Sequence, residues 1–235
     1  MIELQQGNPF FANFYGAFKD SARLFLAMEY IIGGELYNFM TERNGQPFSE
    51  REVAFVVGSV TMMIEFIHSR GFVYRDLKPE NIMIGQDGFL KLIDFGFCKA
   101  LASTSDRTYT PCGTIEYMAP EVLTRLGHGF EADWWSVGVL MFECYHMCTP
   151  FVVDDTEADD TTIIKRVQNP AYVSQFAAPT AAPPFTFDKS ATPEAIALML
   201  DLMQHDMNAR FDVRALLEFC SRPPSNSHPA MRPVE

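Results

Sequence analysis

The hydrophobic positions in the first part of the chain follow the pattern of paired strands. Apolar and aromatic residues dominate residues 10–32, and the run Leu24–Ile32 follows a turn at Lys19-Asp20-Ser21. Two such runs on either side of a polar turn predict an antiparallel pair of strands. Gly33-Gly34 ends the pattern, and we expect a short helix over about 35–43.

The longer segments show the period of α-helices. Ser49-Glu50-Arg51-Glu52 is a capping box, and it opens a long amphipathic helix that runs to about residue 69. The helix expected over 133–147 is apolar on nearly every face, so it should be central and buried. Thr192-Pro193-Glu194 opens another helix with a cap followed by proline, and a final short helix is expected over about 212–220.

Between the helices, two short strands are predicted at 81–84 and 89–92, around the turn sequence Gln86-Asp87-Gly88. Residues 94–120 have no periodicity and form a long loop, which in a compact domain is more often functional than filler. Other segments are expected to be surface insertions or a disordered tail: Asp154–Asp160, 177–184 and 223–235. The pattern places a few strands at the front of the molecule and helices behind them.

The charge balance narrows the classes of partner. The chain has 30 acidic and 18 basic residues, a formal net charge of -12. Nucleic acid and anionic membranes are poor partners for such a surface, because both require basic groups. A basic substrate fits the sign of the charge better, although the charge can equally serve solubility alone.

The cysteines and the apolar runs indicate a reducing compartment. Five cysteines form an odd set without a C-x-x-C pair, which argues against a disulfide framework and a zinc site. The N-terminal sequence MIELQQGNPF lacks the features of a secretory signal. The longest apolar stretch, Val137–Cys148, is too short and too polar to span a bilayer. We therefore expect the protein in the cytoplasm or the nucleus.

Polar residues suited to phosphoryl transfer stand at the two ends of the predicted hairpin. Asn81 enters the hairpin and Asp94 leaves it, so the two should be neighbours. A carboxylate beside an amide oxygen suits a hard cation such as Mg²⁺. Asp76 precedes Asn81 in the same loop, and Lys78 supplies a positive charge for a transferring phosphoryl group. Such a set of groups suits phosphoryl transfer, in which catalysis is mostly positioning and charge stabilisation.

These residues stand within motifs that resemble those of protein kinases. YRDLKPEN at 74–81, DFG at 94–96 and MAPE at 118–121 follow the family's order and spacing, with Asp133-Trp134-Trp135 and Arg210 also matching. DFGFCK at 94–99 and TPCGTIEY at 110–117 make the chain most similar to the AGC group, and within it to the cyclic-nucleotide-dependent (cAMP- and cGMP-dependent) serine/threonine kinases. The resemblance covers about residues 2–220.

The resemblance implies an α+β, protein-kinase-like fold with a mainly helical C-terminal lobe and a truncated, β-rich N-terminal lobe. Residues 1–30 would be the remnant of the N-terminal lobe, 31–222 the C-terminal lobe, and 223–235 a disordered tail. It also implies ATP and Mg²⁺ as cofactors, protein substrates with basic residues upstream of Ser or Thr, and regulation by an activating kinase or a regulatory subunit.

The resemblance gives the loop residues their roles. Asp76 would orient the substrate hydroxyl and accept its proton, Lys78 would contact the γ-phosphate, and Thr114 would position the acceptor. Asn81 and Asp94 would hold Mg²⁺. Lys78, two places after the aspartate, is typical of serine/threonine specificity. Thr110 resembles the activation-loop phosphosite, and its phosphate would pair with Arg75; the alternative is an ordinary loop threonine.

The ATP and substrate pockets are implied in the same way. Met28 would be the gatekeeper, Glu29 and Ile31 would offer backbone groups to adenine, Met83 would form the floor of the pocket, and Glu35 would lie at its edge. For the apolar residues, plain core packing is the alternative. The resemblance also implies that Glu35, Glu80 and Glu143 bind arginines upstream of the phosphorylated residue. The alternative is that these three are solvated surface glutamates.

Three matching residues are expected to be structural. Glu121 and Arg210 would form a buried ion pair, and Asp133 would hold the backbone of the catalytic loop. The histidines show no ligand-like spacing and are assigned no chemistry.

The upper half of the family's ATP site has no counterpart in the motifs of this sequence. Neither G-x-G-x-x-G nor V-A-I-K occurs, and the helix glutamate of the family would fall just before Met1. We therefore expect the remaining front strands to have an open edge and an uncovered face. Two hypotheses follow: a serine/threonine kinase, or a catalytically inactive kinase lobe that binds substrates or regulators.

Overall fold

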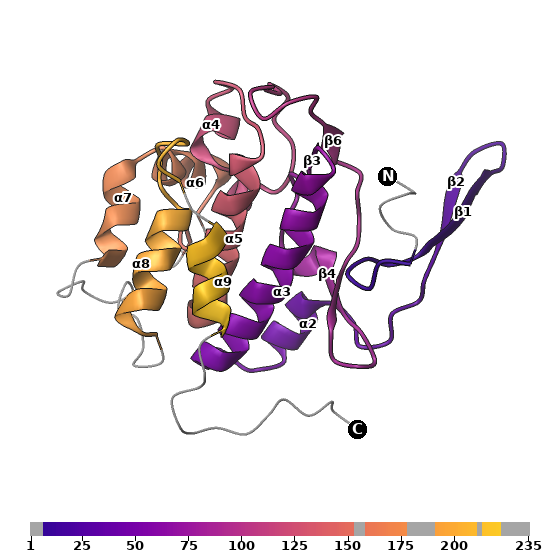
Figure 1. Ribbon diagram of the computed structural model, residues 1–235, viewed down its shortest axis with the longest axis horizontal. Helices are drawn as coiled ribbons and strands as arrows, with labels where there is room; N and C mark the ends of the chain where they lie inside the picture. The colour runs from indigo at the N-terminus through magenta and orange to yellow at the C-terminus, as the bar shows by residue number, and fades with distance from the viewer. Residues whose placement is uncertain (1–6, 153–157, 178–190, 211–212, 222–235) are drawn as a thin grey trace.

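The computed structural model describes residues 7–152, 158–177, 191–210 and 213–221 (Figure 1). The strands form three two-stranded antiparallel sheets, which pair β1 (Phe14–Lys19) with β2 (Leu24–Met28), β3 (Phe72–Val73) with β6 (Lys99–Ala100), and β4 (Ile82–Ile84) with β5 (Leu90–Leu92). The α-helices are α2 (Leu36–Thr41), α3 (Glu50–Ser69), α4 (Pro120–Leu123), α5 (Glu131–His146), α6 (Asp160–Val167), α7 (Pro170–Ser174), α8 (Pro193–Leu202) and α9 (Val213–Ser221). Short 3-10 turns are η1 (Pro79–Asn81), η2 (Ile115–Tyr117) and η3 (Gln175–Ala177). This mixed architecture confirms the predicted α+β class.

Helices α3 and α5 form the centre of the helical part. The predicted capping box opens α3: the Glu52 backbone N–H donates to the Ser49 hydroxyl, and the Ser49 N–H donates to the Glu52 carboxylate. In α5, every residue from Ala132 to Tyr145 is buried, as its apolar sequence predicted. Helix α3 packs against α5 and α9, and α5 packs against α8, so that these helices lie side by side in Figure 1.

Helix α3 is long and apolar enough, by composition alone, to cross a membrane. However, 50% of its most apolar stretch is buried inside the molecule. Its packing against α5 and α9 accounts for that composition without a membrane.

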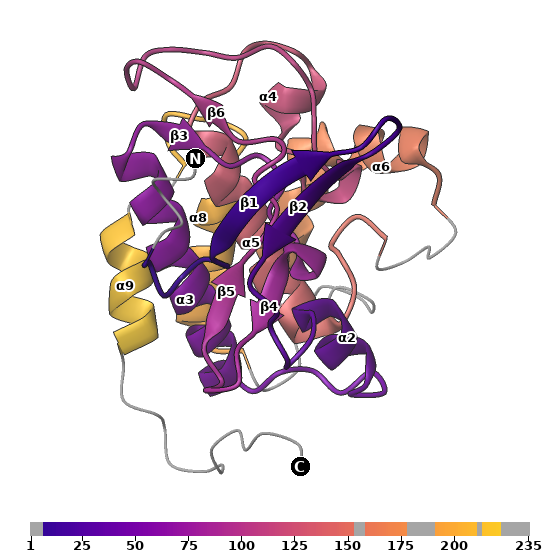
Figure 2. The ribbon, with the colours of Figure 1, turned by 90° about the vertical axis from the view of Figure 1, so that its right-hand side faces the viewer.

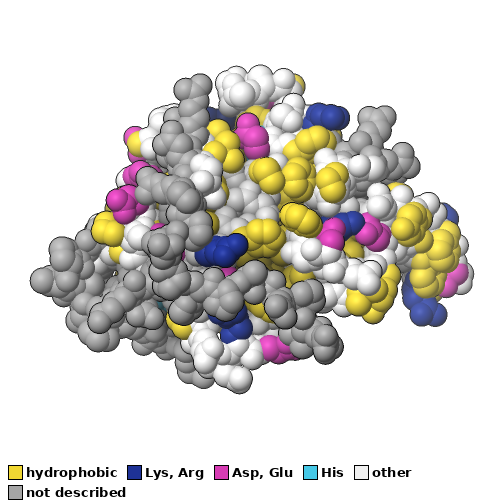
Figure 3. Space-filling model, turned by 60° about the horizontal axis from the view of Figure 1, so that its bottom comes forward, with side chains coloured by type: hydrophobic (Ala, Val, Ile, Leu, Met, Phe, Trp, Pro, Cys, Tyr) yellow, Lys and Arg dark blue, Asp and Glu magenta, His cyan; other side chains and the backbone are white. Residues whose placement is uncertain are grey.

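Strands β1 and β2 form a ribbon that projects from the helical part (Figures 1 and 2). Their pairing runs from Lys19 opposite Leu24 to Phe14 opposite Met28. Four large apolar side chains of the ribbon are more than half exposed: Tyr15, Phe18, Leu24 and Leu26. Figure 3 shows hydrophobic side chains gathered over this end of the molecule. Within the described residues no third strand pairs with β1 or β2, so the ribbon has the open edges that the sequence predicted.

The β4–β5 hairpin joins the ribbon to the helical part. The Leu92 N–H donates to the Phe10 carbonyl and the Ala12 N–H donates to the Leu92 carbonyl, which attaches the chain before β1 to β5. On the other edge, the Gly33 N–H donates to the Ile84 carbonyl at 3.1 Å. A Cβ on Gly33 would lie 2.3 Å from that carbonyl oxygen, so only glycine allows this approach. The hairpin therefore holds both ends of the ribbon at one place.

The structure corrects several expectations about local structure. Helices α6 and α7 were not predicted, because segments of eight and five residues are too short to show a clear period. At the end of the acidic run 154–160, the exposed Asp159 carboxylate caps α6 by accepting from the Thr162 N–H. The loop over 94–120 contains β6, which forms only by pairing with β3 far back in the chain, and η2. Residues 178–184 and 223–235 of the predicted insertion and tail lie outside the described residues.

Candidate active site

The buried Asp133 carboxylate at the start of α5 holds the backbone of the loop that carries Asp76. Its Oδ2 accepts the Tyr74 N–H and its Oδ1 accepts the Arg75 N–H, each at 2.8 Å. The ring Nε2 of His68 lies 2.7 Å from Oδ2. Arg75 has φ = +73°, a left-handed conformation that is costly for a residue with a side chain. The two hydrogen bonds that the Asp133 carboxylate accepts hold the loop in that conformation.

Asp76 lies at the centre of a small polar cluster and is itself buried. The Asn81 amide donates to its Oδ2 at 2.9 Å and to its backbone carbonyl at 2.8 Å. The Thr114 hydroxyl donates to Oδ1 at 3.3 Å, and Lys78 Nζ donates to the Thr114 hydroxyl at 2.8 Å. Lys78 Nζ also lies 3.6 Å from Asp76 Oδ2. The structure thus brings together the four residues predicted to act on the substrate hydroxyl and its surroundings.

Asn81 and Asp94 meet at the base of the hairpin, as its topology predicted. The Ile93 N–H donates to the Asn81 carbonyl at 2.9 Å, which places residue 94 beside the start of β4. Asp94 is exposed, has φ = +53°, and accepts the Gly96 N–H on Oδ1 at 2.8 Å.

The fit to a metal ion follows from these donors. Asn81 uses its amide nitrogen toward Asp76, so its amide oxygen is available, and Asp94 offers a carboxylate oxygen beyond the one that Gly96 occupies. Mg²⁺ is commonly bound by one or two such oxygen donors together with substrate phosphates and water, which fits this pair. No cluster of three or more His, Cys, Asp or Glu residues suited to a metal occurs in the described part of the chain.

The residues predicted to line an adenine pocket come from the end of β2, the segment that follows it, and β4 of the hairpin. Glu35 forms an isolated antiparallel β-bridge with Met83. Ile31, four positions before Glu35 in the sequence, is buried. The Glu29 backbone N–H donates to the Asn13 carbonyl at 2.7 Å. The Glu29 carboxylate is held within the protein, because it accepts Lys91 Nζ at 2.5 Å and the Asn13 backbone N–H at 3.0 Å. The hydrogen bond from Lys91 is the main cause of the lowered pKa of Glu29.

The acidic residues predicted to bind basic substrates are only partly brought together. Glu143 is buried in α5, and the Tyr117 hydroxyl donates to its carboxylate. Burial raises the pKa of Glu143 to about 7, and the negative charges of Glu80 and Glu116 add to the rise. Glu80 Oε2 is buried and accepts no hydrogen bond from the described residues. Glu35 precedes α2, which packs against η1, the turn that contains Glu80.

Sequence reasoning missed several members of this site. Glu116, whose carboxylate accepts the Thr149 hydroxyl at 2.5 Å, belongs to the acidic group through its effect on Glu143. Glu116 and Tyr117 stand in the recognised string TPCGTIEY, which was a usable signal. His68 and Lys91 had none, because their partners Asp133 and Glu29 lie 65 and 62 positions away in the sequence.

The predicted phosphosite is accessible. Thr110 is exposed in the loop between β6 and η2. Arg75 donates its Nε–H to the Phe97 carbonyl at 2.7 Å. Its Nη1 is buried and has no hydrogen-bond partner within the described residues. Arg75 therefore keeps an unused donor.

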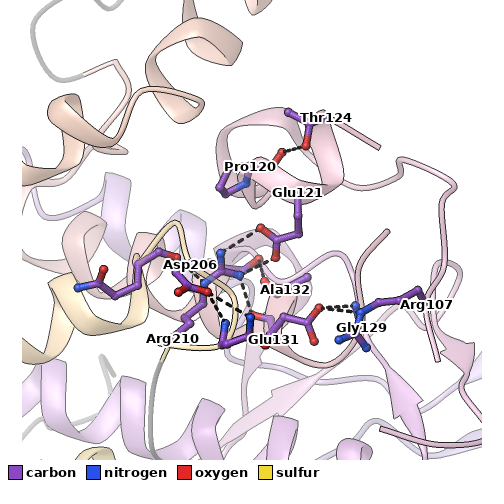
Figure 4. A network of polar contacts seen from close by, with 12 residues as sticks. Arg107, Pro120, Glu121, Thr124, Gly129, Glu131, Ala132, Asp206 and Arg210 are labelled. Carbon is purple, nitrogen blue, oxygen red and sulfur yellow. Dashed lines mark hydrogen bonds and ion pairs between the residues drawn. The ribbon is translucent and has the colours of Figure 1, made fainter. Parts of the chain in front are cut away.

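Glu121 and Arg210 form a bidentate ion pair, with Nη1 to Oε1 at 2.6 Å and Nη2 to Oε2 at 3.0 Å (Figure 4). Arg210 also donates to the carbonyls of Gln204 and Glu131, and its guanidinium lies 5.2 Å from the centre of the Trp135 ring. The pair joins α4 to the segment after α8, so it braces the loop that contains Thr114.

Comparisons with known proteins identify the family to which the chain is similar. A family model described as the protein kinase domain matches residues 1–219. A cAMP-dependent protein kinase catalytic subunit from Dictyostelium discoideum is 44% identical over 151 residues, which cover 64% of this chain and 22% of the relative. Ribosomal protein S6 kinase beta from Caenorhabditis elegans is 43% identical over 168 residues, covering 71% of this chain and 30% of the relative. Ribosomal protein S6 kinase alpha-3 from Homo sapiens is 39% identical over 164 residues, which cover 70% of this chain and 22% of the relative. The chain thus matches less than a third of the length of each of these three relatives.

Proposed function

Because the chain belongs to the protein kinase family, we propose that it transfers the γ-phosphate of ATP to serine or threonine residues of basic protein substrates. The observation that carries the proposal is the cluster around Asp76. A buried carboxylate is hydrogen-bonded by Thr114 and Asn81, and Lys78 lies 3.6 Å from it. Such a group is suited to receive a hydroxyl proton while a nearby cation compensates the charge of a phosphoryl group.

Each residue of the cluster has a defined task in this proposal. Asp76 orients the substrate hydroxyl and accepts its proton as the oxygen attacks the γ-phosphorus. Thr114 and Asn81 fix the orientation of the Asp76 carboxylate, and Lys78 stabilises the charge on the transferring group. When Mg²⁺ is bound with ATP, Asn81 and Asp94 would hold it, and it would neutralise phosphate charge. Met28, Glu29, Ile31, Glu35 and Met83 would line the adenine pocket.

The preference for basic substrates is supported by the acidic residues around η1 and α5. Glu80 has a buried carboxylate oxygen with no donor from the described residues, and a guanidinium would supply one. Glu143 and Glu116 add negative charge beside it. Glu35, at the start of α2, extends the acidic surface. We propose that these residues bind arginines upstream of the phosphorylated residue.

Regulation through Thr110 belongs to the same proposal. A phosphoryl group on this exposed threonine would pair with the unused donor of Arg75 and order the loop. An activating kinase or a regulatory subunit would then control the site.

The test is a transfer assay with the purified chain, Mg-ATP and a peptide that carries arginines upstream of one serine. We expect a phosphopeptide in mass spectrometry, and a loss of at least about 100-fold in rate for Asp76→Asn. Asp201→Asn, on the exposed side of α8, is the matched control and should retain the activity.

The alternative, a catalytically inactive lobe, has its own support, because the sequence contains neither G-x-G-x-x-G nor V-A-I-K. It predicts binding of the arginine peptide, measured by fluorescence anisotropy, without transfer in any variant. Transfer that Asp76→Asn abolishes would exclude this alternative. Transfer that persists unchanged in Asp76→Asn would refute the role of the carboxylate.

A further inference from the structure

The Glu29 carboxylate, directly after β2, connects separate segments of the chain. Its Oε1 accepts Lys91 Nζ from β5 at 2.5 Å. Its Oε2 accepts the Asn13 backbone N–H at 3.0 Å and the Asn13 side-chain amide at 2.9 Å. Asn13 directly precedes β1, whereas Lys91 lies 62 positions after Glu29. With both oxygens occupied, the carboxylate joins the two ends of the ribbon to the β4–β5 hairpin.

The ion pair between Lys91 and Glu29 is partly shielded from water. The two side chains are 17% and 22% exposed, compared with 76% and 47% for the surface pair of Arg23 and Asp20. Exclusion of water strengthens an ion pair, because the effective dielectric constant falls. The hydrogen bond from Lys91 is also the largest cause of the lowered pKa of Glu29, so the carboxylate stays ionised at neutral pH. Lys91 therefore holds Glu29 more firmly than a lysine on an open surface would.

The segment after β2 depends on this side-chain contact for its orientation. The backbone of the hairpin holds residues 10–12 through Leu92 and residues 33–34 through Ile84. Between these two attachments, residues 30–32 make no hydrogen bond with any other described residue. The Glu29 backbone makes one, from its N–H to the Asn13 carbonyl. The Glu29 side chain is thus the polar contact that attaches the middle of this segment to the hairpin.

The same segment presents an unused acceptor and an unused donor. Neither the Glu29 carbonyl nor the Ile31 N–H is hydrogen-bonded within the part of the chain that the structure describes. Adenine offers the complementary groups, an amino donor beside a ring-nitrogen acceptor, and backbone groups commonly orient such ligands. Lys91 stands opposite Met83 in the pairing of β5 with β4, so their side chains share one face of the hairpin. Met83 is the residue proposed as the floor of the adenine pocket.

We infer that Lys91 is a positioning residue for the nucleotide: by holding Glu29, it fixes the backbone at which the adenine base binds. The inference rests on the proposed use of ATP. Lys91 acts through Glu29, because its ammonium group is bound to that carboxylate. It should contribute to nucleotide affinity, since a segment that is ordered before binding loses less entropy on binding. It should contribute little to the transfer step, which belongs to the cluster around Asp76.

The first measurement is the affinity of the full chain for a fluorescent ATP analogue with Mg²⁺, followed by fluorescence anisotropy. Lys91→Met removes the charge and keeps most of the aliphatic stem, and we expect it to raise the Kd about fivefold to tenfold. Lys91→Arg can still donate to the carboxylate and should restore most of the affinity. The matched control is Lys19→Met, which removes an exposed lysine at the end of β1 and should bind like the parent chain.

A double-mutant cycle tests whether Lys91 acts through Glu29. Glu29→Gln should also weaken binding, and the double variant should bind no worse than the weaker of the two single variants. If Lys91 instead touched the nucleotide, Glu29→Gln would free its ammonium group and leave binding unchanged or tighter, which would overturn the inference. In the transfer assay, Lys91→Met should raise the KM for ATP and leave kcat within about twofold of the parent. A fall in kcat at unchanged KM would contradict the positioning role.

Amide hydrogen exchange in the absence of nucleotide needs neither activity nor ligand. Peptides that span residues 29–33 should exchange faster in Lys91→Met than in the parent chain, while peptides from α5 should not change, which shows that the variant remains folded. Equal exchange over 29–33 would refute the ordering of the segment by Lys91. If the parent binds the analogue and Lys91→Met binds it equally well, the use of ATP stands and the role of Lys91 is wrong. If the parent binds no analogue, both are wrong.

Discussion

Replacing Arg210 with methionine removes one half of a buried ion pair and leaves the other half in place. The Arg210 side chain is 0% exposed and the Glu121 side chain 3% exposed, so water does not compensate for the loss. In Arg210→Met the Glu121 carboxylate loses both of its guanidinium hydrogen bonds, and the carbonyls of Gln204 and Glu131 lose their donor. Methionine keeps the apolar contact with Trp135 in large part.

The expected cost is about 3–5 kcal/mol in the free energy of unfolding, the usual range when one partner of a buried pair is removed. For a chain of this size, that loss lowers the Tm by roughly 6–20 °C. Glu121→Met should cost about as much, because it leaves a buried guanidinium with only two carbonyl acceptors. The double variant should lose less than the sum of the two, with a coupling of about 2–3 kcal/mol, since no buried charge then remains.

The measurement is urea unfolding followed by far-UV circular dichroism and by tryptophan fluorescence, so that agreement of the two transitions tests two-state behaviour. The matched control is Arg23→Met, which removes an exposed arginine 3.9 Å from Asp20. Exposed pairs contribute about 0–1 kcal/mol, so this variant should unfold nearly like the parent chain. Single and double variants that add without coupling, or an Arg210→Met loss no larger than that of Arg23→Met, would refute the structural reasoning.

Three further predictions concern Gly33, Glu143 and the cap of α3. Gly33→Ala should weaken binding of a fluorescent ATP analogue, because its Cβ would collide with the Ile84 carbonyl; unchanged affinity would contradict the importance of this close approach. Burial raises the pKa of Glu143 to about 7, above that of an ordinary glutamate. The raised pKa stabilises the fold at pH values below the ordinary glutamate pKa, and this stabilisation is lost as the pH rises through about 7. Urea unfolding at several pH values should show this loss in the parent chain but not in Glu143→Gln, and equal pH profiles would count against it. Ser49→Ala should lower the free energy of unfolding by about 1 kcal/mol through loss of the α3 cap, whereas Ser49→Thr, which keeps the hydroxyl, should retain most of it.

The segments that the sequence predicted well are those whose structure depends on neighbouring residues. The capping box begins α3 where expected, and the turn at Gln86-Asp87-Gly88 forms the β4–β5 hairpin. The hairpin alone was sufficient to predict that Asn81 and Asp94 lie close together, because a hairpin brings its two ends to one place. The sequence did not predict α6, because eight residues are too few to show a clear helical period. It did not predict β6, because that strand forms only by pairing with β3, which lies far back in the sequence.

The candidate site divides in the same way. The loop motif alone was sufficient to select Asp76, Lys78 and Asn81 as a group, because five positions separate the first from the last. The hydrogen bonds of Asp76 and Lys78 with Thr114 required the loop after β6 to fold back, which the ion pair between Glu121 and Arg210 supports across 89 positions.

By itself, the sequence determined the long helices, the β4–β5 hairpin, the family motifs and the residues suited to phosphoryl transfer, because periodicity, caps and turns act over a few residues. Only the tertiary structure decided which distant groups share a site. It turned the Glu29 carboxylate toward Lys91 and raised the pKa of Glu143 by burial. It also placed the His128 ring in a cavity that Arg75 lines, where neither ring nitrogen has a hydrogen-bond partner among the described residues. Burial and proximity are properties of the packed chain, since they depend on how segments far apart in the sequence exclude water from one another.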